Sequence, residues 1–172
     1  MWQIWLGAFA LTVLDFLSKT WVRANLAFGT TQPFIPGVLQ LTLTTNQGGA
    51  FGLGKQYGYS MTILAFLIFI GIAIWSFLRT KGNDKPTILE KFGMCCLLGG
   101  AMGNLLDRIQ YGRVTDFLEF AFVSFPVFNV ADATIDVGIG LIFIAYLIGT
   151  RKESGAPVAQ VQDAAKAPAN ND

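Results

Sequence analysis

Four long apolar segments, separated by polar connections, organise this chain. They run from Trp2 to about Val22, from Tyr57 to Leu78, from Ile88 to Leu106, and from about Ala131 to Thr150. Each is close to the about 20 residues that a helix needs to cross a bilayer. The second segment has no charged residue and is the clearest span. The pattern predicts an all-α membrane protein with four transmembrane helices and both ends on one side.

The connections carry different patterns. Residues 38–44 alternate between apolar and polar side chains, which predicts a half-buried strand in a small extracytoplasmic β-strand region. Residues 107–130 are rich in aromatic side chains, which is typical of a membrane interface, and predict an amphipathic loop at the membrane surface. Residues 153–172 have few large apolar side chains and predict a disordered tail. The membrane domain is therefore expected to be residues 1–152.

The composition supports a membrane protein. Hydrophobic residues make up 53% of the chain and charged residues 13%, whereas a soluble domain has about 25% charged residues. The net charge of +1 gives no indication of a nucleic-acid partner. The absence of histidine removes the commonest metal ligand and the usual general base. Cys95 and Cys96 are adjacent, and adjacent cysteines rarely form a disulfide, so we interpret them as small core or lipid-facing residues. Because the chain has no histidine to complete a metal site with them, we expect no metal or cofactor.

Four carboxylates lie inside or beside the apolar segments: Asp15, Asp107, Asp116 and Asp132. A charge in the membrane costs roughly 2.5–3.5 kcal/mol on insertion scales, so such groups usually have a function. Alternating helices would bring all four to the same face of the membrane.

Simpler explanations exist for most of them. Asp15 and Lys19 are spaced to pair on one helix. Asp107 beside Arg108 is typical of an ion pair at a helix end, and Asp132 is placed to cap a helix.

Five motifs taken together resemble the bacterial lipoprotein signal peptidase (type II signal peptidase) family. They span most of the chain outside the tail: Asp15-Phe16-Leu17-Ser18-Lys19, Asn46-Gln47-Gly48-Gly49-Ala50-Phe51, Gly99 through Asn104 to Arg108, Val114-Thr115-Asp116-Phe117, and Phe128-Asn129-Val130-Ala131-Asp132. Any one motif is weak, but five in order are specific. The chain departs from the family pattern in two places. Phe16 replaces the usual glutamine, and Asp136 is an extra carboxylate one turn after Asp132.

The resemblance implies an aspartic intramembrane protease that cuts prolipoproteins just before a cysteine carrying a diacylglyceryl group. The family's catalytic pair corresponds to Asp116 and Asp132. Two carboxylates that share a proton can act as base and acid without a metal. The other matching residues are expected to position the substrate, orient the dyad or build the site: Asn46, Gly48, Asn104, Arg108, Asn129, Asp15 and Lys19. Asp107 is expected to form a structural ion pair, and the glycine-rich residues 47–57 a mobile flap.

The same resemblance implies the surroundings of the protein. The expected partners are a diacylglyceryl prolipoprotein and membrane lipids, and the expected oligomeric state is a monomer. The expected location is the bacterial inner membrane, with cytoplasmic termini and an active site near the extracytoplasmic face.

Three alternatives remain open from the sequence. Intramembrane carboxylates also occur in ion- or proton-coupled transporters, although no internal repeat is visible. A second alternative is a non-catalytic lipid- or prolipoprotein-binding protein, although the presence of both Asp116 and Asp132 argues against it. A Ser–Lys protease would use Ser18 or Ser60 with Lys19.

Overall fold

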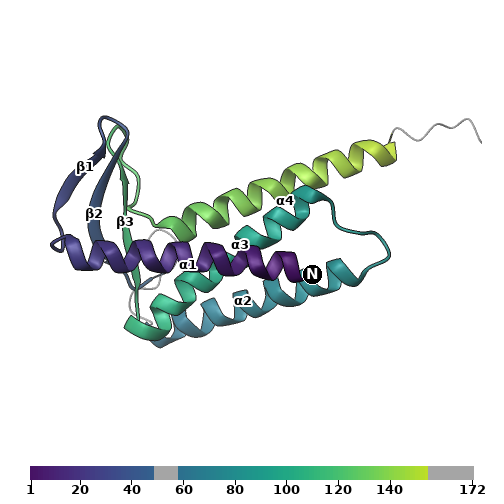
Figure 1. Cartoon of the computed structure of the whole chain (residues 1–172), viewed down its shortest axis with the longest axis horizontal. Helices are drawn as coiled ribbons and strands as arrows, with labels where there is room; N and C mark the ends of the chain where they lie inside the picture. Colours follow the sequence, from purple (N-terminus) through teal and green to yellow (C-terminus); the bar gives the residue numbers. More distant parts are fainter. Residues whose placement is uncertain (49–57, 155–172) are drawn as a thin grey trace, which may run out of the picture.

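The computed structural model describes residues 1–48 and 58–154. The elements in chain order are α1 (Trp2–Asn25), β1 (Thr31–Ile35), β2 (Leu39–Asn46), α2 (Gly58–Lys81), α3 (Ile88–Tyr111), β3 (Val114–Phe120) and α4 (Val130–Ser154). The helices form an elongated bundle, and the strands form a small sheet at the end where α1 finishes and α4 begins (Figure 1).

The four predicted helices are all present, and each continues beyond its predicted C-terminal end. By length and composition, Tyr59–Lys81 in α2 and Val130–Thr150 in α4 are candidate membrane spans. Helices α1 and α3 carry more charge, so their crossing of the membrane stays a prediction. Helix α4 continues to Ser154, so residues 153 and 154 of the predicted disordered tail are helical, and residues 155–172 lie outside the described residues.

The strand expected at residues 38–44 is confirmed as part of β2, the central strand of an antiparallel sheet with the order β1-β2-β3. The prediction of a loop over residues 107–130 was wrong for residues 107–120, whereas residues 121–129 do connect β3 to α4 outside any named helix or strand. Helix α3 continues to Tyr111, and Gly112 ends it in the left-handed conformation (φ 68°), with its N–H donating to the Arg108 carbonyl. The chain then enters β3 directly. The many aromatic side chains suggested an interface and obscured a strand that has Thr115 and Asp116 in its buried half.

Glycines let α3 pack closely against its neighbours. A Cβ added to Gly100 would lie 2.5 Å from the Ala131 carbonyl oxygen of α4, and one added to Gly103 would lie 2.5 Å from Asp15 Oδ2 of α1. Both positions therefore require glycine for α1, α3 and α4 to approach one another. Close helix packing is therefore what these glycines provide.

Candidate active site

Asp116 lies in the third position of β3, with 3% of its side chain exposed. In the sheet it is paired with Thr44 of β2, and the neighbouring Val114 and Phe117 are also buried. Its Oδ1 accepts a hydrogen bond from Asn129 Nδ2 at 2.7 Å. Strand β3 thus places the Asp116 carboxylate beside the start of α4.

Asp132 lies in the first turn of α4, three residues after Asn129. The two residues form a reciprocal cap: the Asp132 N–H donates to Asn129 Oδ1 at 2.9 Å, and the Asn129 N–H donates to Asp132 Oδ2 at 3.2 Å. Asp132 Oδ1 accepts from Asn104 Nδ2 at 2.7 Å. Asn129 therefore holds both predicted catalytic carboxylates.

The surroundings of Asp116 favour its protonated form. Burial, and then the negative charge of Asp132, raise the pKa of Asp116 from 3.8 to about 7. The hydrogen bond from Asn129 and the charges of Lys19 and Arg108 oppose this rise. At neutral pH Asp116 is thus divided between its two forms, as expected for carboxylates that share a proton.

Lys19 is a buried cation at the centre of the polar network, with 1% of its side chain exposed. Its Nζ lies 2.7 Å from Asp15 Oδ2 and 3.7 Å from Asp107 Oδ2, and it donates to Asn104 Oδ1 at 2.9 Å. Asp15 Oδ1 in turn accepts from the Ala131 N–H at 2.8 Å. The predicted pairing of Asp15 with Lys19 is confirmed, and the pair also links α1 to α3 and α4.

Asp107 forms an ion pair, but not with Arg108 as the sequence suggested. Its Oδ1 lies 3.1 Å from Arg23 Nη1, and its Oδ2 accepts from the Thr115 N–H at 2.8 Å. Arg23 Nη1 also donates to Thr115 Oγ1 at 2.9 Å. The sequence analysis missed Arg23 and Thr115. Arg23 could have been noticed one turn after Lys19, on the same helix face.

Arg108 instead reaches the segment after β2. Its Nη2 donates to the Gly48 carbonyl at 2.6 Å, and the Gly48 N–H donates to Asn46 Oδ1 at 2.9 Å. Arg108 Nη1 is buried with no hydrogen-bond partner among the described residues. Both Asp116 and Asp132 lie close enough to Arg108 to act on its charge.

The structure thus brings all the predicted site residues into one connected region. Asp136 is exposed one turn away from Asp132. The rest of the predicted flap, residues 49–57, lies outside the described residues. Ser18 donates to the Asp15 carbonyl at 2.7 Å, and the hydrogen bond of Lys19 goes to Asn104, so their geometry does not favour a Ser–Lys pair. In the described part of the chain, no three His, Cys, Asp or Glu residues are grouped to hold a metal.

Comparisons with known proteins show the family of this chain. The family model for signal peptidase (SPase) II matches residues 7–148. The lipoprotein signal peptidase of Gloeobacter violaceus is 39% identical over 153 residues, covering 89% of this chain and 84% of that protein. The lipoprotein signal peptidase of Nostoc punctiforme is 37% identical over 154 residues, covering 88% and 93%.

Two solved structures share the fold of this chain. One bacterial membrane enzyme superposes with a TM-score of 0.80 at 26% identity, covering 92% of this chain and 95% of the other. A second gives a TM-score of 0.74 at 27% identity, covering 86% and 94%. The fold is therefore that of a bacterial membrane enzyme, and the chain belongs to the signal peptidase II family of peptidases.

Proposed function

We propose that this protein removes the signal peptide from diacylglyceryl-modified prolipoproteins, cutting just before the lipidated cysteine, with Asp116 and Asp132 as an aspartic dyad. The observation that carries the proposal is the shared contact with Asn129, which hydrogen-bonds Asp116 through Nδ2 and Asp132 through its backbone N–H. Family membership supports the proposed reaction, and this geometry supports the assignment of its catalytic residues.

The two carboxylates have different partners, which suits different roles. Both oxygens of Asp132 accept from N–H donors, an arrangement that stabilises a carboxylate. Asp116 uses only Oδ1 with Asn129 and has a pKa of about 7, so its protonated form is well populated at neutral pH. Asp132 is accordingly the base and Asp116 the acid at the start of the reaction.

Hydrolysis follows from these roles. Asp132 takes a proton from water as the water oxygen attacks the scissile carbonyl carbon, and Asp116 gives its proton to the carbonyl oxygen. The resulting diol returns one hydroxyl proton to Asp116 while Asp132 protonates the leaving nitrogen, and the C–N bond breaks. Every proton is accounted for, and the dyad ends in its starting state.

The surrounding residues position the substrate and the dyad. Arg108 Nη1 is the donor left for a backbone carbonyl of the substrate, while Nη2 holds Gly48 and, through it, Asn46. Lys19 fixes Asn104, which orients Asp132.

All four helices cross the inner membrane in this proposal, with the termini in the cytoplasm and the sheet at the extracytoplasmic surface. The charges of α1 support this placement, because Asp15 and Lys19 are each 1% exposed and face the bundle. The outward residues of α1 are large and apolar, including Phe9 at 67% and Leu17 at 58% exposure. A lipid-facing surface needs that distribution. Residues 1–152 form one membrane domain, which acts as a monomer on its lipidated substrate.

The test is a gel-shift cleavage assay with purified diacylglyceryl prolipoprotein. Wild type and Asp136→Asn are expected to cleave, whereas Asp116→Asn and Asp132→Asn are expected to leave the substrate intact while remaining folded. Asp136→Asn is the matched control, because it removes an exposed carboxylate from the same helix as Asp132. Cleavage by either dyad variant would refute the assignment. Binding without cleavage by wild type would favour the non-catalytic alternative.

A further inference from the structure

A second site lies between α1, α2 and α3, away from the dyad. It contains a cavity of about 290 Å³ lined by Trp5, Ala8, Phe9, Thr12, Phe69, Leu98, Met102 and Leu106. Thr12 is the one hydroxyl in this set, and it donates to the Ala8 and Gly99 carbonyls at 2.9 and 3.1 Å. Apart from this bonded hydroxyl and the indole N–H of Trp5, the lining is apolar and suits hydrocarbon.

This cavity opens away from the catalytic residues. On α3 it is lined by Met102 and Leu106, each two residues from Asn104. Two residues correspond to about 200° around a helix with 3.6 residues per turn. Asn104 faces Asp132, so the cavity lies on the opposite side of α3. A ligand here would leave the dyad free.

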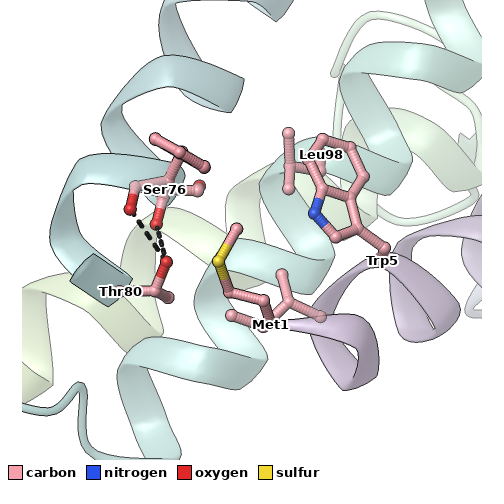
Figure 2. A pocket seen from close by; sticks show the side chains of 7 residues that line it. Met1, Trp5, Ser76, Thr80 and Leu98 are labelled. Atoms are coloured by element: carbon pink, nitrogen blue, oxygen red, sulfur yellow. Dashed lines mark hydrogen bonds between the residues drawn. The ribbon is translucent and has the colours of Figure 1, made fainter.

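A smaller hollow lies nearer the start of α1 (Figure 2). We call the cavity and this hollow together the groove. It is lined by Met1, Ile4, Trp5, Ser76, Phe77, Thr80 and Leu98, and it shares Trp5 and Leu98 with the larger cavity. The Ser76 side chain is 4% exposed, and its Oγ has no hydrogen-bond partner among the described residues. Thr80 is already bonded to the Ser76 and Phe77 carbonyls of its own helix. Ser76 is thus a buried hydroxyl donor in a hollow whose other lining residues are mostly apolar, with polar groups on Met1, Trp5 and Thr80.

We propose that this groove binds one membrane glycerolipid, with an acyl chain in the larger cavity and its ester carbonyl accepting a hydrogen bond from Ser76 Oγ. The dimensions fit this occupant. Leu98 to Leu106 covers about 12 Å along α3, which is close to the depth of one leaflet in a hydrocarbon core of about 30 Å. Ser76 lies about 7.5 Å before the end of α2 at Lys81, on the side where a leaflet's ester groups lie.

The charge at this end of the bundle agrees with a phospholipid. Lys81 lies in the last turn of α2, where it can meet a phosphate beyond the ester. Arg79 in the same turn is already bound by Glu90 of α3 at 2.8 Å and by the Asp84 carbonyl, so it adds positive charge near the phosphate without contacting it. No hydrogen bond or ion pair joins α1 to α2 in the described part of the chain. The lipid would therefore add packing where these two helices meet through apolar contacts alone.

The test is lipid retention, measured by native mass spectrometry on the full-length protein purified in detergent and supplied with a diester phosphatidylglycerol. Wild type is expected to keep one lipid. The double variant Met102→Trp/Leu106→Trp fills the cavity and should lose it, whereas Leu147→Trp on the exposed side of α4 is the matched control and should keep it. Retention by the filled variant, loss by the control, or a protein dimer in place of a lipid adduct would overturn the proposal.

A second measurement tests the hydrogen bond itself and does not depend on peptidase activity. A diether lipid with the same chains lacks the ester carbonyl. Wild type should bind the diester about fivefold more tightly than the diether, the usual size of one net hydrogen bond. Ser76→Ala should bind both equally and to the level of the diether. Equal binding of both lipids by wild type would refute the role of Ser76.

Discussion

Replacing Asp116 by asparagine should abolish cleavage and yet stabilise the protein at alkaline pH. Burial and the charge of Asp132 raise the pKa of Asp116 from 3.8 to about 7. Each tenfold change in the acid dissociation constant corresponds to about 1.36 kcal/mol, so ionised Asp116 costs the folded protein about 4 kcal/mol. The stabilising contribution of protonated Asp116 is complete below pH 3.8 and is lost as the pH rises to about 7. Asparagine is neutral at every pH and can still accept from Asn129.

The assay is thermal unfolding in detergent micelles as a function of pH. At about pH 9 the melting temperature of Asp116→Asn should be roughly 10 °C higher than that of wild type. The difference between the two proteins should vanish at about pH 4. Asp132→Asn is the matched control, because both oxygens of Asp132 accept hydrogen bonds and an amide nitrogen cannot. It should lower the melting temperature. An Asp116→Asn protein that is less stable than wild type at alkaline pH would refute the reasoning about the dyad.

Two further substitutions test the network around the dyad. Lys19→Met should lower the free energy of unfolding by about 3–5 kcal/mol, because Asp15 would remain buried without its cation. Chemical denaturation in micelles measures this free energy, and a loss below about 1 kcal/mol would contradict the prediction. Gly103→Ala should displace Asp15 Oδ2, which its Cβ would approach to 2.5 Å, and should reduce cleavage at least about tenfold. Gly140→Ala on α4 meets no atom within 4 Å and should cleave like wild type.

The helices could be predicted from the sequence because each is a long apolar segment, and the segment that forms the core of α2 contains no charged residue. The site residues could be predicted as a set only from the family motifs, because residues that contact one another in the site are far apart in the sequence. Asp107 shows the limit. Its sequence neighbour is Arg108, but its ion-pair partner is Arg23, 84 residues earlier. Helix geometry explains the difference, because adjacent residues point in different directions.

Strand β3 could not be predicted from alternation. In an isolated half-buried strand, polar residues would face water, yet Thr115 and Asp116 are each 3% exposed. Arg23 of α1 and Asp107 of α3 bind Thr115, and Asn129, just before α4, binds Asp116, so successive residues of this strand are both buried. Burial on both faces removes the period of two on which a sequence-based prediction depends. That same burial raises the pKa of Asp116, so the feature that obscured the strand also serves the proposed chemistry.

Asn129 allows capping and catalysis to be separated by one pair of substitutions. Its Oδ1 caps α4 through Asp132, while its Nδ2 donates to Asp116. Serine is also a good N-cap but cannot supply both contacts, whereas alanine supplies neither. Asn129→Ala should therefore lose about 1 kcal/mol of stability relative to Asn129→Ser, and both should cleave slowly. Because the bond from Asn129 lowers the pKa of Asp116, its loss in either variant should move the alkaline limb of the pH–rate profile to higher pH. Full activity in Asn129→Ser, with an unchanged profile, would mean that Asn129 is only a helix cap and that the dyad is oriented by Asn104 alone.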